Sequence, residues 1–413
     1  MEKGITLSVC IPNYNRPDRL EKLVRAVVNQ ILNLRLERII EICISDDCSP
    51  LNPDFIIEKL KTDYPAVLLN YRRNEQNMGM DHNFLNSVMM AQGKYAWIIG
   101  NDDLPTENAF HIFMNVVNDD TYKDVDFIVT PFDCYDYENN YRMTTYPFGS
   151  SMGSFMIDTN DRNGLHQLIM NVQSNGAMFD FLSNVIFKRE RWLEHANKFD
   201  DKMNTLFIQI YMNMQTLLDG ARYLYIPEKI IYDFIDDDTN ETLDRTYKIV
   251  VGLYDVYSFF YSGEERRHLE RKVLDIFIQS FLFEMEEHDK KRARLCGYNE
   301  GKINALKKYY IKKKDRNEYF NRKLIAIYGA GNNGLLALEE LGEYVTDIVG
   351  FCDADKNKQG KIIHGKEVFD YNRLKKLYAE HKDMIVVVAN HLFTDIIVQQ
   401  LEMDMISNIA IIT

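Results

Sequence analysis

Short apolar runs alternate with amphipathic segments over the first hundred residues of the chain. The apolar runs predict strands at Leu7–Ile11, Ile39–Ser45, Val67–Tyr71 and Tyr95–Ile99, and the amphipathic segments predict helices at Arg19–Leu32, Phe55–Leu60 and Asp81–Ala91. Strands that alternate with helices indicate a mostly parallel sheet covered on both faces. Such a sheet binds ligands at the carboxyl ends of its strands. We therefore expect an α/β fold with its functional residues just past the strand ends.

The pattern changes after about residue 122. Tyr135–Tyr146 is rich in Tyr and Asn and reads as a loop, Arg162–Val172 and Leu206–Leu218 are predicted helices, and Thr246–Tyr319 looks almost wholly helical. A new strand, glycine-rich turn and helix begin at Lys323. These shifts predict an α/β domain over residues 1–240, a helical connector over 241–320 and a small Rossmann-like domain over 321–413.

The composition narrows the range of partners. Hydrophobic residues make up 46% and charged residues 27% of the chain, as is typical of a globular protein. The formal net charge of −13 argues against a nucleic-acid partner. The six cysteines form no CxxC pair and no Cys/His metal spacing, so reduced thiols are expected.

The chain shows no signal-peptide pattern and no run of roughly 18 apolar residues. A cytoplasmic protein is expected, with a position at the inner face of the membrane as the alternative. Lys307–Lys314 is strongly basic. It reads either as a solvated helix face or as a peripheral contact with anionic lipid.

Four polar motifs follow the predicted strands. They are Pro12-Asn13-Tyr14-Asn15 with Arg16 after it, Asp46-Asp47-Cys48-Ser49, Asn77-Met78-Gly79 and Asn101-Asp102-Asp103. Two carboxylates at the end of a buried strand cost free energy unless a cation pairs with them. Mg²⁺ or Mn²⁺ takes one or two carboxylates together with substrate phosphates, although an ordinary acidic turn is the alternative.

In order and spacing these four motifs resemble glycosyltransferase family 2, the nucleotide-sugar transferases of the GT-A fold. The resemblance covers residues 7 to 105 and, more weakly, extends to about residue 232. It implies a metal-assisted, inverting transfer of a sugar from a nucleotide-diphosphate donor, with UDP as the expected nucleotide. The implied acceptor is a glycan or a lipid-linked sugar, and the implied setting is bacterial surface-polysaccharide assembly.

The resemblance also implies roles for the motif residues. The loop from Pro12 to Asn15, with Asp46 or Asp47, would hold the base and ribose of the donor. Arg16, with Arg72 or Arg73, could contact the phosphates, and a solvated surface position is the alternative for each. The remaining implied donor residues are Asn77, Gly79 and Asn101, and the implied ligands of Mg²⁺ or Mn²⁺ are Asp102 and Asp103. The family's metal motif usually begins with an aspartate where this chain has Gly100, so metal binding rests on those two carboxylates.

Inverting transfer needs a carboxylate to deprotonate the acceptor hydroxyl. By the family's spacing this position falls on Gln209, which cannot act as a base. Asp180, Asp200 and Asp201 are the nearest candidates, with a turn or cap role as the alternative for each. The missing carboxylate motivates a second hypothesis, a nucleotide-sugar-binding scaffold with little turnover.

A second glycine motif lies in the C-terminal region. Gly329, Gly331 and Gly334 follow an apolar run, and Asp353 ends the next one. This is the Rossmann arrangement, in which the glycines approach a phosphate and the acid binds a ribose hydroxyl. The segment resembles the small Rossmann modules of polysaccharide-biosynthesis enzymes. Nucleotide binding and a structural role in a homo-oligomer both stay open, and an NAD-dependent sugar-nucleotide enzyme is a third alternative.

Overall fold

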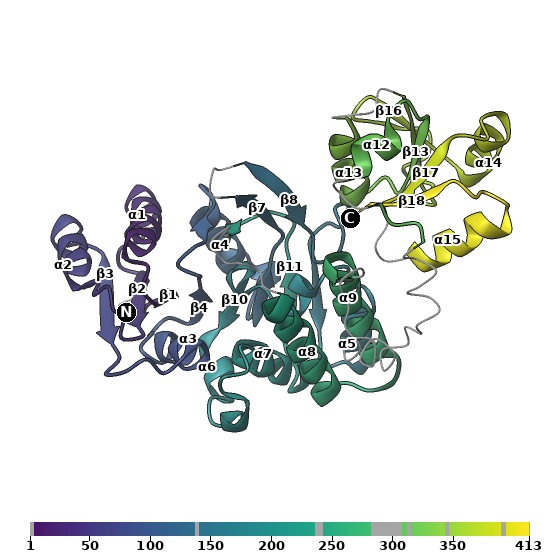
Figure 1. Ribbon diagram of the computed structural model, residues 1–413. Helices are drawn as coiled ribbons and strands as arrows, with labels where there is room; N and C mark the ends of the chain where they lie inside the picture. The colour runs from purple at the N-terminus through teal and green to yellow at the C-terminus, as the bar shows by residue number, and fades with distance from the viewer. Residues whose placement is uncertain are drawn as a thin grey trace. The chain divides into compact units, whose positions relative to one another are not determined.

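The computed structural model describes residues 4–136, 140–235, 243–281, 308–311, 315–342, 347–389 and 394–412 (Figure 1). The chain divides into two compact units, Met1–Val273 and Leu274–Thr413. Both units are α/β, as the alternation of apolar runs and amphipathic segments predicts. Among the described residues no helix is long and apolar enough to cross a membrane.

The first unit is built on an eight-stranded sheet with the order β3-β2-β1-β4-β10-β6-β11-β9. Its strands are β1 Leu7–Asn13, β2 Ile40–Asp46, β3 Leu68–Arg73, β4 Tyr95–Ile98, β6 Phe127–Val129, β9 Phe155–Asp158, β10 Val185–Lys188 and β11 Arg222–Tyr225. The first four are parallel. The strand β10 runs antiparallel to both of its neighbours, and β9 runs antiparallel to β11.

The strand order places a topological switch point between β1 and β4. Strands β2 and β3 extend the sheet on one side of β1, whereas β4 lies on its other side. Because crossovers between parallel strands are right-handed, this reversal puts the helices before and after it on opposite faces. Figure 1 shows this for α1 (Pro17–Leu34) and α2 (Asp54–Asp63) against α3 (Met80–Met89). The crevice at such a point is where open α/β sheets bind ligands.

The first strand differs from its expected end at Ile11, since it continues through Pro12 to Asn13. Proline removes a ladder hydrogen bond and is tolerated where one side of the strand is unpaired. Here β4 pairs with β1 only as far as Cys10, whereas β2 pairs with it to the end. The ordered strand therefore carries Asn13 to the edge of the sheet.

The reading of residues 135–146 as a loop is wrong. Strands β7 (Phe132–Asp136) and β8 (Tyr141–Thr145) form an antiparallel pair within a second sheet, ordered β5-β12-β7-β8. The rings of Tyr135 and Tyr141 lie 5.8 Å apart across this pair. Tyrosine and threonine favour pleated, half-buried surfaces, and the Asp, Glu and Asn residues among them concealed that preference in the sequence. The other strands of this sheet are β5 Leu104–Pro105 and β12 Ile231–Ile235.

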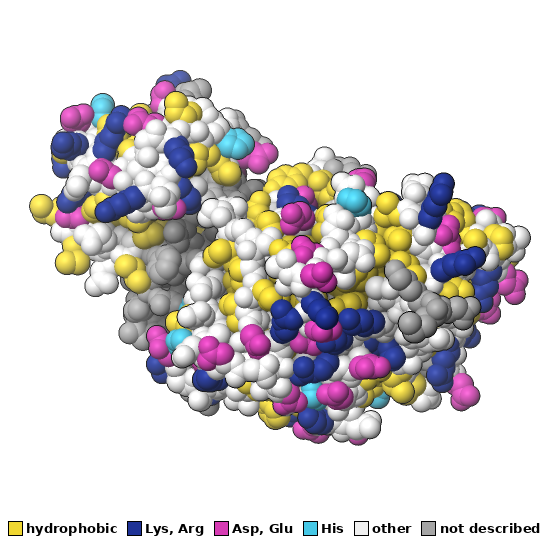
Figure 2. Space-filling view, turned by 180° about the vertical axis from the view of Figure 1, so that it is seen from behind, with side chains coloured by type: hydrophobic (Ala, Val, Ile, Leu, Met, Phe, Trp, Pro, Cys, Tyr) yellow, Lys and Arg dark blue, Asp and Glu magenta, His cyan; other side chains and the backbone are white. Residues whose placement is uncertain are grey.

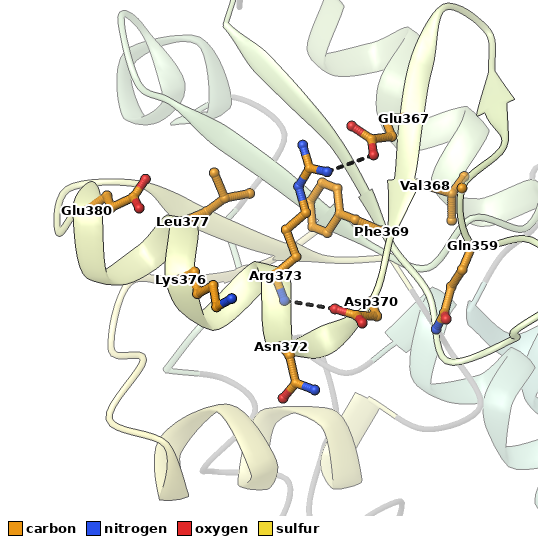
Figure 3. A pocket seen from close by; sticks show the side chains of 11 residues that line it. Gln359, Glu367, Val368, Phe369, Asp370, Asn372, Arg373, Lys376, Leu377 and Glu380 are labelled. Atoms are coloured by element: carbon orange, nitrogen blue, oxygen red, sulfur yellow. Dashed lines mark hydrogen bonds and ion pairs between the residues drawn. The ribbon is translucent and has the colours of Figure 1, made fainter.

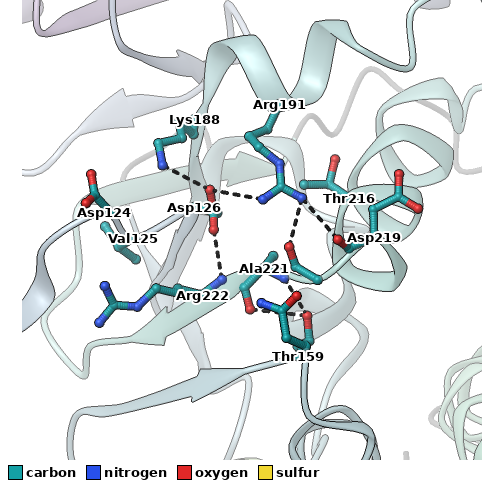
Figure 4. Close-up of polar contacts among 12 residues, drawn as sticks. Asp124, Val125, Asp126, Thr159, Lys188, Arg191, Thr216, Asp219, Ala221 and Arg222 are labelled. Carbon is teal, nitrogen blue, oxygen red and sulfur yellow. Dashed lines mark hydrogen bonds and ion pairs between the residues drawn. The ribbon is translucent and has the colours of Figure 1, made fainter.

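A buried carboxylate ties the middle of the first unit together (Figure 4). Asp126 Oδ1 lies 3.3 Å from Lys188 Nζ and 3.8 Å from Arg191 Nη1, and Asp126 Oδ2 accepts the N–H of Arg222 at 2.9 Å. Arg191 also donates to the carbonyl of Gly220 at 2.8 Å. A buried charge is tolerated where it is paired and hydrogen-bonded. These contacts join β10 and β11 to the loop after α7.

The remaining helices of the first unit are α4 Ala109–Asn118, α5 Arg162–Met170, α6 Arg189–Leu193, α7 Ile208–Leu218 and α8 Leu243–Phe260, while α9 Gly263–Phe281 spans the division at Val273. Helix α8, predicted as the start of a connector, belongs to this unit and packs on α7. A Cβ atom at Gly252 would lie 1.9 Å from Cε2 of Phe207, the residue that precedes α7. The absence of a side chain at Gly252 thus makes room for that ring.

The second unit contains a six-stranded sheet with the order β15-β16-β14-β13-β17-β18. Its strands are β13 Ile325–Tyr328, β14 Ile348–Cys352, β15 Ile362–Ile363, β16 Lys366–Phe369, β17 Ile385–Val388 and β18 Ile409–Ile411. All neighbouring pairs are parallel except β15 with β16. Its described helices are α12 Arg316–Phe320, α13 Asn332–Gly342, α14 Tyr371–Glu380 and α15 Thr394–Met403.

The expectation of a basic helix face over Lys307–Lys314 falls largely outside the described residues, because Lys307 and residues 312–314 are not described. Within the described part, Lys308 lies 3.0 Å from Glu402. On the face of each unit seen in Figure 2, Lys and Arg side chains are interspersed with Asp and Glu side chains.

Candidate functional site

Three polar side chains meet where the strands next to the switch point end. Asn13 ends β1, Asp46 ends β2 and Asn101 follows β4. The side-chain amide of Asn13 donates to Asp46 Oδ1 at 2.7 Å, and its oxygen accepts from Asn101 Nδ2 at 2.8 Å. Because parallel strands end at the same edge of a sheet, motifs almost ninety residues apart in sequence form one connected group.

Asp46 is buried, and its carboxylate is engaged in hydrogen bonds and an ion pair within the protein. Ser49 donates to it through both its hydroxyl, at 2.5 Å, and its backbone N–H, at 3.0 Å. Arg73 Nε lies 3.3 Å from its second oxygen. The Ser49 hydroxyl also accepts the N–H of Asn15 at 2.8 Å. Asp46 therefore orders the loops after β1 and β2, and a direct contact with a base stays a prediction.

Asp47 holds the third motif in place. Its Oδ1 accepts the N–H of Met78 at 2.9 Å and the side-chain amide of Asn74 at 2.9 Å, and its Oδ2 accepts the N–H of Gly79 at 2.9 Å. Gly79 has a φ of +91°, which glycine adopts without strain. Asn77 is exposed and its side chain accepts from Gly79 N at 3.0 Å. A carboxylate that accepts several backbone N–H groups fixes the path of a loop.

Solvent reaches the outer residues of the same edge. Tyr14 is 45% exposed, so its ring is available for stacking. Arg16 Nη1 lies 2.5 Å from Asp102 Oδ2, and both side chains are 32% exposed. This ion pair places one cationic and one anionic group beside the three strand ends. Asp46 and Asp102 thus belong to one site, because Asn13 and Asn101 connect the strands that carry them.

Asp103 is buried next to Asp102. Its Oδ2 accepts from the Ser183 hydroxyl at 2.5 Å. Burial, and then the charges of Asp102 and Asp233, raise the pKa of Asp103 well above its usual range. A Cβ atom at Gly100 would lie 2.8 Å from Asp102 Oδ1 and 3.0 Å from Asp103 Oδ2. The two carboxylates therefore converge on the position where the family usually has a further aspartate.

Asp233 is a site residue that the sequence analysis missed. In the antiparallel pairing of β12 with β5, Tyr232 lies opposite Leu104. Continued by one residue, the same register brings Asp233 opposite Asp103. Cys134 Sγ donates to Asp233 Oδ2 at 3.3 Å. The partner strand β5 has only two residues, which leave no periodic signal in the sequence. A third carboxylate thus lies near the acidic pair.

The acidic pair fits a divalent cation that takes most of its ligands from elsewhere. Within the described ranges, no group of three or more His, Cys, Asp or Glu side chains is arranged to hold a metal ion. Asp102 and Asp103 supply two carboxylates, and Mg²⁺ or Mn²⁺ in phosphate sites completes its shell with substrate phosphates and water. Burial and, after it, the repulsion from Asp102 raise the pKa of Asp103, and such a cation would relieve that repulsion.

The three candidates for the base lie in different surroundings. Asp180 precedes η3 (Leu182–Asn184), the 3₁₀ turn whose Ser183 contacts Asp103. Burial raises the pKa of Asp180 to about 7, although its carboxylate accepts the N–H of Phe181 at 2.8 Å. Asp200 and Asp201 lie in the 3₁₀ turn η4 (Asp200–Lys202). Asp200 is exposed, and Asp201 pairs with Lys202 at 2.9 Å with 71% of its side chain exposed.

The glycine motif of the second unit forms the predicted strand, turn and helix. Gly329 has a φ of +112°, and a Cβ atom at Gly334 would lie 1.9 Å from the Gly329 carbonyl oxygen. Asp353 Oδ2 accepts the N–H of Ala330 at 2.7 Å and lies 3.4 Å from Lys358 Nζ, while Oδ1 accepts the N–H of Asp355 at 2.8 Å. The expected ribose acid is therefore engaged by its own loops.

The second unit also has a surface hollow of about 720 Å³ (Figure 3). It is lined by the following residues: Gln359, Gly360, Glu367, Val368, Phe369, Asp370, Asn372, Arg373, Lys376, Leu377 and Glu380. Two of its charged groups pair with each other, because Arg373 Nη1 lies 2.8 Å from Glu367, and the Asp370 carboxylate accepts the backbone N–H of Arg373 at the start of α14. The hollow does not include the glycine motif.

Comparisons with known proteins agree with this architecture. Residues 8–190 match the family model of glycosyl transferase family 2, and residues 321–412 match the model described as C2185-like, N-terminal. The abequosyltransferase RfbV of Salmonella typhimurium is 29% identical over 256 residues, which are 59% of this chain and 71% of that protein. An uncharacterized glycosyltransferase of Mycoplasma genitalium is 29% identical over 122 residues, 29% of this chain and 40% of that protein.

Solved structures show the same fold. Residues 1–349 of TarS from S. aureus superpose with a TM-score of 0.51 at 12% identity, covering 71% of this chain and 79% of that one. The same fragment in complex with UDP gives 0.51 at 13% identity, covering 70% and 78%. The switch-point site, the family match and these folds agree. Residues 8–190 therefore form a glycosyltransferase family 2 domain within the GT-A fold of the first unit, and the protein is a glycosyltransferase.

Proposed function

We propose that this glycosyltransferase moves a sugar, with inversion, from a UDP-linked donor to a hydroxyl of a glycan or lipid-linked acceptor. The observation that carries the proposal is the connected edge formed by Asn13, Asp46 and Asn101 with the Arg16–Asp102 pair beside it. This edge offers the exposed aromatic ring of Tyr14 and the charges of Arg16 and Asp102. A nucleotide diphosphate has a base that stacks and a pyrophosphate that pairs with such charges.

On this proposal the ring of Tyr14 stacks on the base, and the guanidinium of Arg16 leaves Asp102 to pair with the diphosphate. Arginine suits this role because its fork of N–H donors matches phosphate oxygens. Asp102 and Asp103 would hold Mg²⁺ or Mn²⁺, which when bound supplies positive charge to the departing diphosphate. The partly exposed ion pair is well suited to such an exchange of partners.

Asp180 is the proposed general base. It accepts the proton of the acceptor hydroxyl as the oxygen bonds to the anomeric carbon, and the nucleoside diphosphate leaves from the opposite face with the bonding electrons. With a pKa of about 7, the carboxylate is a stronger base than an ordinary aspartate and is still substantially ionised at neutral pH. The proposal is supported by the short segment from Asp180 to Ser183, because the Ser183 hydroxyl donates to Asp103 of the acidic pair.

The acceptor class and a role in surface-polysaccharide assembly are supported by the family resemblance. RfbV, named an abequosyltransferase, agrees with a sugar-transferring role. For the second unit a structural or oligomerising role is favoured over dinucleotide chemistry, because Asp353 is engaged by the N–H groups of Ala330 and Asp355.

The test combines donor binding with turnover. A thermal-shift screen of UDP, UDP-sugars, GDP-sugars and NAD(H), each with and without Mn²⁺, is expected to give its largest shift with a UDP ligand and the ion, since ligands stabilise the state they bind. Product analysis by mass spectrometry and NMR then reports transfer and anomeric configuration. Donor binding without turnover would support the scaffold hypothesis instead, and retention of configuration would exclude the inverting mechanism.

A further inference from the structure

Asp81 is a fully buried carboxylate outside the site described above. It lies in the first turn of α3 and its Oδ2 accepts the N–H of Leu206 at 3.0 Å. Burial raises the pKa of Asp81, while backbone N–H groups between Asn204 and Ile208 act in the opposite direction. Its second oxygen is buried without a hydrogen-bond partner among the described residues. A carboxylate in such a position is retained only where its acceptor bonds matter.

The segment that Asp81 holds is strained. Asn204 has a φ of +68° and Leu206 a φ of +75°, the left-handed region that side chains other than glycine rarely adopt. Such conformations persist only where the surroundings impose them. The segment leads directly into α7, which begins at Ile208. The hydrogen bond from Leu206 to Asp81 is therefore the restraint that links the start of α7 to α3, beside local bonds within the segment such as Phe207 N–H to Thr205.

The same end of α3 is bonded to the loops that follow β1 and β2. These two loops carry the proposed donor-binding residues and are called the donor loops. Asp47 binds the N–H groups of Met78 and Gly79, and Asn83 of α3 donates to the carbonyl of Asn13 at 3.1 Å. A Cβ atom at Gly79 would lie 3.0 Å from the side-chain oxygen of Asn204. The start of α3 thus lies between the donor loops and the segment before α7.

The surface of this junction is accessible and apolar. Met78 and Met80, on either side of Gly79, are 41% and 51% exposed, and Leu206 is 36% exposed. Because Leu206 is hydrogen-bonded to the same turn of α3, these side chains border the donor loops from neighbouring segments. An acceptor that approaches the donor from this side would contact the strained segment.

We propose that Asp81 is a positioning residue, which holds residues 204–207 and the start of α7 against the donor loops and so fixes where the acceptor binds. The inference rests on the proposed function. Asp81 touches neither donor nor acceptor, and its effect passes through the backbone of the segment that it holds. Loss of its charge loosens the acceptor side and leaves the donor side, held by Asp47, in place.

The test separates donor from acceptor in the full-length chain. Asp81→Asn is compared with wild type for UDP affinity, hydrolysis of the UDP-sugar, and transfer to the p-nitrophenyl glycoside that the wild type uses best. The expected result is a rise of about tenfold in acceptor KM and a fall of similar size in transfer, because a small misplacement is costly in a positioned reaction. UDP affinity and hydrolysis should change less than about twofold, within the scatter of a neutral substitution.

Hydrogen exchange supplies a readout that does not need an acceptor. In Asp81→Asn the amides of residues 206–210 should exchange at least tenfold faster, while those of Met78 and Gly79 keep their protection. Unchanged exchange at α7, or equal losses in donor and acceptor constants, would overturn the inference. A wild type that neither binds nor hydrolyses any UDP-sugar would instead refute the proposed function, and the exchange result would still decide the structural claim.

A matched control is Asp161→Asn. Asp161 also accepts a backbone N–H at a helix start, from Asn163 at 3.0 Å at the beginning of α5. The Asp161→Asn variant should keep the wild-type KM values for both the donor and the acceptor. Should Asp81→Asn fail to fold, the substitution is repeated in a Leu206→Gly background, where glycine adopts the required φ without strain. The same split between donor and acceptor is expected relative to Leu206→Gly alone, and its absence would contradict the proposal.

Discussion

In both units of this protein aspartates follow parallel strands, but the groups that stabilise their carboxylates differ between the two units. Asp102 and Asp103 lie side by side, with one paired to a partly exposed arginine and the other buried with a raised pKa. Asp353 instead accepts two backbone N–H groups of its own loops and lies near Lys358. An aspartate after a strand therefore indicates a ligand site only where hydrogen bonds and charges within the chain do not fully stabilise its carboxylate.

The largest effect is expected at Asp102. Replacing it by alanine removes a carboxylate from the proposed cation site and the partner of Arg16, and kcat/KM for sugar transfer should fall about 10³-fold, corresponding to about 4 kcal/mol. Transfer rates with saturating Mn²⁺ check this. Asp353→Ala is the paired control in the other unit and should keep wild-type kcat/KM. Equal losses in the two variants would remove the distinction between the units.

Asp180→Asn should lower kcat about 10²-fold, the size typical of losing a general base. The wild-type rate should rise from pH 6 to pH 8 and then level off, because Asp180 must be ionised and its pKa is about 7. Stopped assays across this range measure both effects. If Asp201→Asn abolished transfer while Asp180→Asn did not, the base would lie in the exposed η4 turn instead.

The same substitution should raise stability at high pH. A carboxyl whose pKa rises from about 3.9 in the unfolded chain to about 7 on folding loses stability as pH increases between those values. Asparagine carries no charge, so Asp180→Asn should have a higher Tm than wild type at pH 8 and nearly the same Tm at pH 4. A variant that is less stable at pH 8 would show that the carboxylate is not strained by burial.

In the second unit the expected effects concern stability. Gly334→Ala places a methyl group 1.9 Å from the Gly329 carbonyl oxygen, and overpacking of this kind costs about 1–3 kcal/mol. Denaturant unfolding should show the loss, while UDP affinity of the first unit stays at the wild-type value. Gly331→Ala is the matched control, since a Cβ atom there meets no atom within 4 Å.

The smallest effect is expected at Asp353. Its replacement by asparagine weakens the hydrogen bonds to Ala330 and Asp355 and should cost about 1 kcal/mol of unfolding free energy. Nicotinamide dinucleotides, titrated by fluorescence, should bind neither wild type nor variant. Tight binding to wild type that Asp353→Asn abolishes would give the second unit a ligand site and erase the contrast.

Sequence patterns were sufficient for the parallel half of the first sheet, because each strand end carried a polar motif and the order of the motifs resembled a known family. They were insufficient where a partner was far away in sequence. Asp233 comes near the acidic pair only through the pairing of its strand with a two-residue strand, and Asp81 binds the segment before α7 only across more than a hundred residues of sequence. Contacts of that kind leave no local periodicity.

The roles of Asp46 and Asp47 could not be resolved from sequence for a related reason. A strand-end aspartate facing a ligand and one that binds a loop have the same local sequence. The structure shows the second use for both, through Ser49 and through Met78 with Gly79.

The packing of the Phe207 ring against Gly252 limits where the chain can be truncated. A gene truncated near codon 240 would delete α8 and uncover an aromatic side chain at the start of α7. An aggregating or insoluble protein is the expected result, because exposed apolar surface promotes association. Anyone wishing to crystallise the catalytic half alone should place the stop codon beyond α9.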